Sequence, residues 1–290
     1  MLQLISENVF AYLSIVGILG LLVGSFLNVV ILRLPVMMEK EWHAQCDDLL
    51  GNETSTNQAA PFNLVTPHSH CPKCNHKIRA IENIPIVSYL FLKGCCSKCK
   101  VSIPLRYPII EATTALLSVV VAWHFGPTLE AAAALLLTWA LVALTVIDFD
   151  HQLLPDCITL PFLWLGLGVS LAAVFTSPES AIIGALVGYL SLWSVYMLFK
   201  LVTGKEGMGH GDFKLLAMLG AWLGWQSIFP IILLSSAVGA VVGITLIVVR
   251  GRDRNIPIPF GPYLAAAGWI TLLWGDQLIE AYLTMMNISP

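Results

Sequence analysis

Two short acidic segments contain the side chains best suited to chemistry. Ile147-Asp148-Phe149-Asp150 closes a long apolar run, and Gly209-His-Gly-Asp212 opens another. A carboxylate at the edge of a membrane span is costly unless it has a partner or a task. Two carboxylates held about 3 Å apart share one proton, so one can activate water while the other protonates a carbonyl oxygen. We therefore predict that Asp148 and Asp212 form a catalytic pair that hydrolyses peptide bonds.

The neighbouring acidic residues have simpler explanations. Asp150 ends an apolar span, and Asp156 follows a proline, where it can cap the next helix. Asp148 lies deepest against its apolar run, which favours it as the partner of Asp212. Asp212 could also be only a helix N-cap, a role that does not exclude catalysis. Glycine leaves space for an approaching substrate strand, so we take Gly209 and Gly211 as candidate substrate-binding residues.

Four cysteines form a second candidate site. They make two Cys-x-x-Cys pairs separated by 21 residues, a spacing typical of structural zinc sites. The four are Cys71, Cys74, Cys96 and Cys99. Four thiolates leave no open position on the metal, so we predict structural Zn²⁺ that supplies folding free energy to a loop poor in apolar residues. Cys95 is out of register with the second pair, and three histidines either replace a cysteine or face solvent: His68, His70 and His76.

The composition is that of a membrane protein. Of the 290 residues, 57% are hydrophobic and 11% are charged, against about 25% charged in soluble domains. Charge-free runs suited to membrane helices occupy residues 8–32, 112–129, 131–147, 157–178, 180–199, 215–249 and 255–275. The run 215–249 is too long for one span, and we divide it between Gly224 and Pro230. The sequence predicts an all-α polytopic protein with about eight transmembrane helices.

Three regions follow from this pattern. Residues 1–33 are expected to hold the first transmembrane helix, and residues 34–107 a zinc-binding domain outside the membrane. Residues 108–290 are expected to form a seven-helix membrane domain with the aspartates. The net charge of −3 gives no indication of a nucleic-acid partner.

The basic residues predict the orientation. Nine of the fifteen lie in 33–106, and the rest lie near the Gly-x-Gly-Asp turn or after the seventh span. With eight spans and an outside N-terminus, all fifteen fall on one side, which is then the cytoplasmic side. Both acidic segments fall on the cytoplasmic side too, as does the loop within residues 34–107 that contains the four cysteines, which we call the cysteine loop. Cytoplasmic thiols stay reduced, which favours a metal over two disulfides.

Motifs along nearly the whole chain resemble the bacterial type IV prepilin peptidases, which are bifunctional leader peptidases and N-methyltransferases. The resemblance rests on the two acidic segments, the cysteine loop and four further motifs. These are Gly24-Ser-Phe-Leu-Asn28, Glu82-Asn-Ile-Pro85, Arg106-Tyr-Pro108 and Pro257-Ile-Pro-Phe-Gly-Pro262. By the family's pattern the catalytic aspartates are Asp148 and Asp212.

The resemblance also implies substrates and a second reaction. The substrates would be type IV prepilins and type II secretion pseudopilins, whose basic leader is cut after a glycine on the cytoplasmic side of the bacterial inner membrane. The second reaction would methylate the new N-terminal amine with S-adenosylmethionine. No Gly-x-Gly-x-x-Gly follows a strand, so any cofactor pocket is not of the usual Rossmann type. The resemblance places the cofactor in 34–107 without indicating which residues bind it. Membrane lipid is the remaining expected partner.

Two alternative functions fit part of the pattern. Another Gly-x-Gly-Asp protease could cut helices within the bilayer, but the cysteine loop counts against it. A proton-coupled transporter would need charges in mid-span, whereas here they lie at span ends. Two features have no assigned role. The proline-rich segment 257–263 either lines a substrate strand beside Asp212 or is a connecting loop. Glu111 is either a site residue or an interfacial charge, and we favour the interfacial charge.

Overall fold

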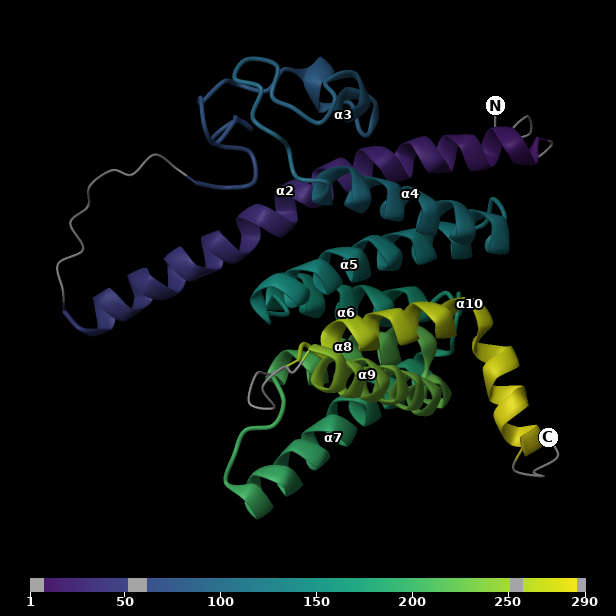
Figure 1. The fold of residues 1–290 in the computed structure, drawn as a ribbon. Coiled ribbons are helices and arrows are strands. Elements are labelled where there is room, and N and C mark those ends of the chain that lie inside the picture. The colour runs from purple at the N-terminus through teal and green to yellow at the C-terminus, as the bar shows by residue number, and fades with distance from the viewer. Residues whose placement is uncertain (1–7, 52–61, 251–257, 286–290) are drawn as a thin grey trace. The chain divides into compact units, whose positions relative to one another are not determined.

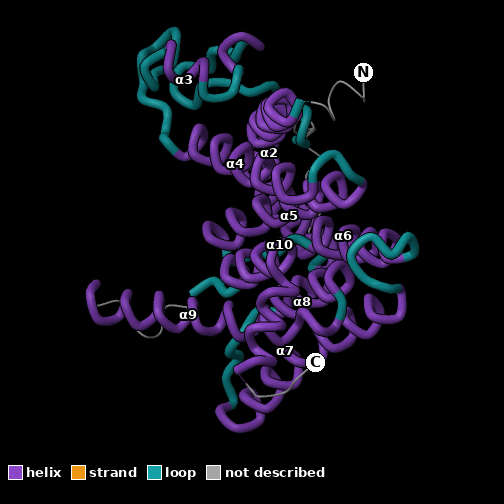
Figure 2. The backbone as a smooth tube through the Cα atoms, turned by 90° about the vertical axis from the view of Figure 1, so that its right-hand side faces the viewer, coloured by secondary structure: helices purple, strands orange, loops and turns teal. Residues whose placement is uncertain are grey.

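The computed structural model describes residues 8–51, 62–250 and 258–285. Those residues form helices and loops and no strand apart from two isolated β-bridges (Figure 2). The chain divides into two compact units, residues 1–127 and 128–290. The all-α prediction is confirmed.

The first unit is built on a pair of helices that lie side by side (Figure 1). These are α2 (Val9–Leu49) and α4 (Arg106–Phe125). Glycines let the two backbones approach closely, as small residues do in membrane helix pairs. A Cβ at Gly20 would lie 2.7 Å from Cα of Ala115, and one at Gly24 would lie 2.8 Å from Cα of Glu111.

The first helix extends beyond the expected end of the first span. α2 passes through Arg33 and Pro35 and ends only at Leu49. The boundary expected at residue 33 therefore falls inside a helix, because the polar stretch after Pro35 is rich in helix-forming residues such as Met, Glu, Lys and Ala. Between α2 and α4 lie η1 (Ala80–Asn83), α3 (Val87–Phe91) and the cysteine loop.

The second unit packs around a buried helix, α8 (His210–Leu223). Six of its large apolar side chains are almost completely buried: Phe213, Leu215, Leu216, Met218, Leu219 and Trp222. A helix that is apolar on all sides needs neighbours all round. Three of the helices around it, α6 (Asp156–Ser170), α7 (Pro178–Thr203) and α10 (Gly261–Met285), make most of its contacts. The unit also contains α5 (Leu129–His151), η2 (Trp225–Ser227) and α9 (Ile228–Arg250).

The predicted membrane helices are present. Five segments are long and apolar enough to cross a bilayer: Val9–Leu49, Arg106–Phe125, Leu129–His151, Pro178–Thr203 and Trp225–Leu246. The helices α6, α8 and α10 complete a set of eight within the described ranges, in agreement with the predicted count. The long run 215–249 is interrupted at Gly224, whose φ of 83° lies in the left-handed region that favours glycine.

Candidate active site and metal centre

Asp148 and Asp212 lie at the ends of two helices of the second unit. Asp148 belongs to the last turn of α5, and Asp212 belongs to the first turn of α8, which follows the N-cap Gly209. α5 stops because Gln152 adopts a left-handed conformation and its N–H bonds the Asp148 carbonyl at 2.9 Å. Both side chains are buried, with 5% of Asp148 and 7% of Asp212 exposed.

The two carboxylates belong to one site. They are close enough for the charge of Asp148 to act directly on Asp212. Oδ2 of Asp148 is buried and has no hydrogen-bond partner among the residues that the structure describes. A buried carboxylate oxygen without a partner is costly, which is the arrangement expected of a group that receives a proton or a substrate. That the pair is catalytic stays a prediction at this point.

Glycines leave the carboxylates accessible at close range. A Cβ at Gly261 would lie 2.6 Å from Oδ2 of Asp148, and one at Gly209 would lie 3.7 Å from Oδ2 of Asp212. Gly211 instead faces the side chain of Leu154, whose Cβ is 2.7 Å from the position of an added Cβ. Of the two candidate substrate-binding glycines, only Gly209 therefore faces a carboxylate.

The proline-rich segment contributes to the site through the start of α10. The backbone of Gly261 contacts the Asp148 carboxylate, so this segment lies against Asp148. The two interpretations of the sequence were a substrate strand beside Asp212 and a connecting loop. Pro257 lies outside the described residues. The motif that contains Gly261 was singled out from the sequence, but Gly261 itself was not predicted as a site residue.

The other polar residues near the aspartates have structural partners. Asp156 opens α6 and accepts two hydrogen bonds from Nζ of Lys214, at 2.8 and 2.7 Å. This ion pair was not predicted. The ring of His210 packs edge-on against Tyr196, with centroids 5.2 Å apart.

An apolar cavity of about 390 Å³ lies beside the aspartate site. Its walls include Met208, which immediately precedes the N-cap of α8, and Ile258 to Phe260, which precede α10. The helices α7 and α9 supply Leu192, Ile232 and Gly239 among others, and α10 supplies Tyr263. The cavity therefore borders the segments that position both aspartates.

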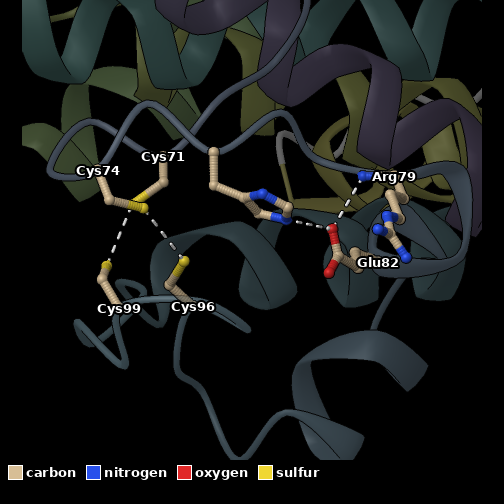
Figure 3. A network of polar contacts seen from close by, with 7 residues as sticks. Cys71, Cys74, Arg79, Glu82, Cys96 and Cys99 are labelled. Atoms are coloured by element: carbon tan, nitrogen blue, oxygen red, sulfur yellow. Dashed lines mark hydrogen bonds and ion pairs between the residues drawn. The ribbon is translucent and has the colours of Figure 1, made fainter.

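The four predicted cysteines come together in the first unit (Figure 3). Each Cys-x-x-Cys pair forms the same turn and is followed by a residue with positive φ, Asn75 at 54° and Lys100 at 58°. In each turn the N–H of that residue bonds the carbonyl of the first cysteine, at 2.9 and 3.1 Å. Two equivalent turns thus present two pairs of thiols to each other.

The thiol geometry fits a tetrahedral metal ion. The Sγ atoms lie within 4.8 Å of one another, with Cys71 and Cys99 3.7 Å apart and Cys74 and Cys96 4.0 Å apart. Tetrahedral Zn–S bonds of about 2.3 Å require sulfur–sulfur distances of about 3.8 Å. Backbone N–H groups of Cys74 and Lys73 lower the pKa of Cys71 to about 6, which favours the thiolate that a metal needs.

The remaining candidates for this centre lie apart from it. Cys95 forms an isolated bridge with Ser102 and is not in the cluster. Nε2 of His76 lies 3.3 Å from Oε2 of Glu82, close enough for an ion pair but not aligned for a hydrogen bond. Figure 3 shows Glu82 to one side of the cysteines, where it accepts a hydrogen bond from the Arg79 N–H at 2.9 Å.

Comparisons with known proteins cover most of the chain. A family model described as the bacterial peptidase A24 N-terminal domain matches residues 18–125, and the type IV leader peptidase family matches residues 135–244. A Pseudomonas aeruginosa protein named prepilin leader peptidase/N-methyltransferase is 58% identical over 98% of this chain and 97% of its own length. Proteins of the same name from Stutzerimonas stutzeri and Aeromonas hydrophila are 57% and 56% identical, and cover 99% and 94% of this chain and 99% and 94% of their own lengths. No solved structure matches the chain.

Proposed function

The chain belongs to the type IV leader peptidase family of prepilin leader peptidases/N-methyltransferases, and from this premise we propose that Asp148 and Asp212 cut the prepilin leader as one proton-sharing pair. Prepilin cleavage and N-methylation are the activities of the family. The proposal concerns the residues that perform cleavage. It is carried by one observation, that two buried carboxylates from different helices interact within a single site.

The pair can carry out hydrolysis without a metal. The ionised aspartate takes a proton from water as the water oxygen attacks the carbonyl carbon, while the protonated aspartate donates to the carbonyl oxygen. The tetrahedral intermediate then collapses: the C–N bond breaks, one aspartate protonates the leaving amine, and the other takes a proton from a hydroxyl of the intermediate, which restores the shared proton. Burial supports this chemistry because electrostatic interactions strengthen where water is excluded.

Helix starts supply a favourable field at the site. Asp212 lies in the first turn of α8, and the start of α10 at Gly261 contacts Asp148. The N-terminus of a helix carries a partial positive charge, which stabilises a carboxylate or a developing oxyanion nearby. The two helix starts therefore favour the negative charge that the reaction requires.

The apolar cavity is a candidate binding site for part of the substrate. By resemblance, the leader precedes a hydrophobic helix, and an apolar cavity bordered by Met208 and Phe260 suits a side chain from that helix. We extend the proposed substrates to pseudopilins of type II secretion, with cleavage after a glycine. Gly209 leaves open space next to Asp212 for the substrate strand.

We further infer that the four cysteines bind Zn²⁺ as a structural ion. Four thiolates fill the tetrahedron, so the ion stabilises the loop and leaves no open position for chemistry. Residues 34–107 then form a zinc-binding domain, residues 1–33 the first transmembrane helix and residues 108–290 the peptidase domain. The proposed methyl donor is S-adenosylmethionine.

The protein is a membrane protein, and we propose that its site faces the cytoplasm across the bacterial inner membrane. The distribution of Lys and Arg supports this orientation, because all fifteen fall on one side of an eight-span topology. The aspartates and the cysteine loop fall on the same side.

Replacing each aspartate tests the proposal. In lipid vesicles with a prepilin, Asp148→Asn and Asp212→Asn should each lower the cleavage rate at least about a thousandfold, because neither member works alone. Asp150→Asn changes an exposed carboxylate two residues from Asp148 and should retain cleavage. Normal cleavage by either of the first two variants would show that the pair is misassigned. A wild type that leaves prepilins intact would overturn the function itself.

A further inference from the structure

A second cavity, of about 420 Å³, lies within the first unit. One side is formed by α2 and α4, which contribute Ser25, Asn28, Val29 and Glu111. The other side is formed by the cysteine loop and α3, including residues next to both cysteine pairs. Its volume is within the range of small-molecule sites. Neither of the proposed catalytic aspartates lines this cavity.

A buried carboxylate lines this cavity. Glu111 is 8% exposed and accepts a hydrogen bond from the Ile86 N–H at 2.8 Å, and Ser25 lines the same cavity. A carboxylate offers about four acceptor sites, so capacity remains. No basic side chain among the described residues pairs with Glu111. A buried carboxylate without a cation is costly, and a positively charged ligand would offset that cost. Glu111 is therefore more than the interfacial charge we expected.

The backbone next to Glu111 is strained. Ile86 has φ 57° and ψ −48°, a conformation that β-branched residues avoid. This conformation directs its N–H to the carboxylate of Glu111. Strain of this kind persists where the surrounding structure enforces it, and it is concentrated at functional sites.

The cavity is held in shape from both sides. The Arg33 guanidinium on α2 donates to the carbonyls of Asn63 and Pro67, at 2.9 and 2.6 Å, and ties the loop to the helix. Cys71 and Cys96, one from each cysteine pair, line the cavity. A metal that fixes the cysteine turns would therefore also fix the cavity wall.

Resting on S-adenosylmethionine as the methyl donor proposed above, we propose that this cavity is the methyl-transfer site and binds S-adenosylmethionine with the Glu111 carboxylate facing its sulfonium. The cavity has the volume of a cofactor site, a largely apolar wall and a buried carboxylate, Glu111, with no ion pair among the described residues. Arg33 also lines the cavity, but its guanidinium is bonded to the carbonyls of Asn63 and Pro67. A sulfonium is a cation that donates no hydrogen bond, so it fits a carboxylate that already accepts one from the Ile86 N–H. Glu111 acts as the counter-charge.

The charge on the reactants explains why a fixed anion is useful. The neutral N-terminal amine attacks the methyl carbon; the N–C bond forms as the C–S bond breaks, and its electron pair stays on sulfur. One positive charge moves from sulfur to nitrogen, and no proton is transferred in the step. The α-amino group ordinarily has a pKa of about 7.7 to 8.0, so a useful fraction is neutral at cellular pH. The Glu111 carboxylate stabilises this positive charge both on the sulfonium and as it moves to the amine nitrogen.

Two ligands that differ only in the methylsulfonium test the role of Glu111. Equilibrium dialysis of the full-length protein in lipid nanodiscs measures binding of S-adenosylmethionine and of its neutral thioether product, S-adenosylhomocysteine. Glu111→Gln keeps the shape and an acceptor oxygen but removes the charge. It should weaken S-adenosylmethionine binding at least about tenfold and change S-adenosylhomocysteine binding less than about twofold. The control Glu179→Gln alters an exposed carboxylate at the start of α7 and should leave both affinities unchanged.

Filling the cavity tests its location. Val29→Trp places an indole in the cavity and should abolish binding of both ligands, whereas Leu22→Trp, on an exposed side of the same helix, should not. Prepilin cleavage by each variant checks that the protein is folded. If Val29→Trp fails to cleave, the location of the site is tested instead by Glu111→Gln, through the ratio of its affinities for S-adenosylmethionine and S-adenosylhomocysteine.

The outcomes separate this proposal from the one on which it rests. If wild type binds both ligands and methylates, but Glu111→Gln and a cleavage-competent Val29→Trp do the same, the cavity is the wrong site and N-methylation stands. Equal weakening of both ligands in Glu111→Gln would overturn the sulfonium contact. A wild type that neither binds S-adenosylmethionine nor methylates the cleaved product would remove the methyltransferase activity itself.

Discussion

Gly261 lies so close to Asp148 that a Cβ on residue 261 would stand 2.6 Å from Oδ2 of the carboxylate. Gly261→Ala should therefore displace Asp148 or the start of α10 and lower prepilin cleavage by at least about tenfold, since small misplacements of reacting groups are costly. The measurement is kcat/KM for a prepilin in lipid vesicles.

A matched glycine provides the control for this substitution. A Cβ at Gly168, within α6, has no heavy atom within 4 Å, so Gly168→Ala should cleave at the wild-type rate. Prepilin cleavage by Gly261→Ala at the wild-type rate would contradict the contact between the start of α10 and Asp148.

Loss of a cysteine ligand should unfold the cysteine loop. Cys96→Ser removes one of four clustered thiols and should abolish tight zinc binding, since structural zinc contributes about 10 to 16 kcal/mol to small metal domains. Metal analysis should find about one zinc per wild-type chain and none in the variant, and limited proteolysis should cut the variant's loop sooner. Cys46→Ser, an exposed cysteine on α2, should behave as wild type. Zinc-free wild type with an equally resistant loop would refute the metal centre.

Narrowing the apolar cavity should impair substrate binding more than chemistry. The nearest atom to a Cβ at Gly239 would be one of Tyr263, at 3.4 Å, an ordinary contact distance, and Gly239 lines the cavity, so the side chain of Gly239→Leu can occupy the cavity space and reduce it. We expect KM for a prepilin to rise about five- to tenfold with little change in kcat, because the lost contact binds the substrate equally well in the ground state and in the transition state. Gly168→Leu adds the same side chain at an open position and should not alter KM. An unchanged KM in Gly239→Leu would place the substrate elsewhere.

The ion pair between Lys214 and Asp156 should contribute little stability. The side chains are 29% and 53% exposed, and pairs this accessible to solvent couple by less than about 1 kcal/mol. A double-mutant cycle of Lys214→Met and Asp156→Asn, followed by denaturant unfolding, measures the coupling. A coupling above about 2 kcal/mol would show that the pair is effectively desolvated.

Glu82 should make the loop's stability depend on acidity. The Arg79 N–H, the Ser97 hydroxyl and His76 lower the pKa of Glu82. A lowered folded pKa stabilises the fold above the unfolded value of about 4.3, and the contribution is lost as pH falls through the folded pKa. The stability difference between wild type and Glu82→Gln should thus be constant at neutral pH and shrink in acid. A difference that grows on acidification would have the wrong sign.

Local pattern was enough to predict several features of this protein. The charge-free runs predicted the helices, because apolar length alone decides whether a segment suits a bilayer. The motifs also indicated the family, which the comparisons confirm. The Cys-x-x-Cys spacing singled out the four thiols that the structure brings together, since each pair lies within one turn. These features depend on neighbouring residues, which the sequence displays directly.

Other features required the tertiary structure. Gly261 lies against Asp148, Lys214 pairs with Asp156, and Glu111 is buried beside Ile86 in a cavity. α2 continues through Arg33, past the expected end of its span. Each contact joins segments whose local sequences contain no information about one another. Helix packing, through close approaches such as that of Gly24 to Glu111, decides which residues meet, so the sequence indicated the reactive groups and the packing selected their partners.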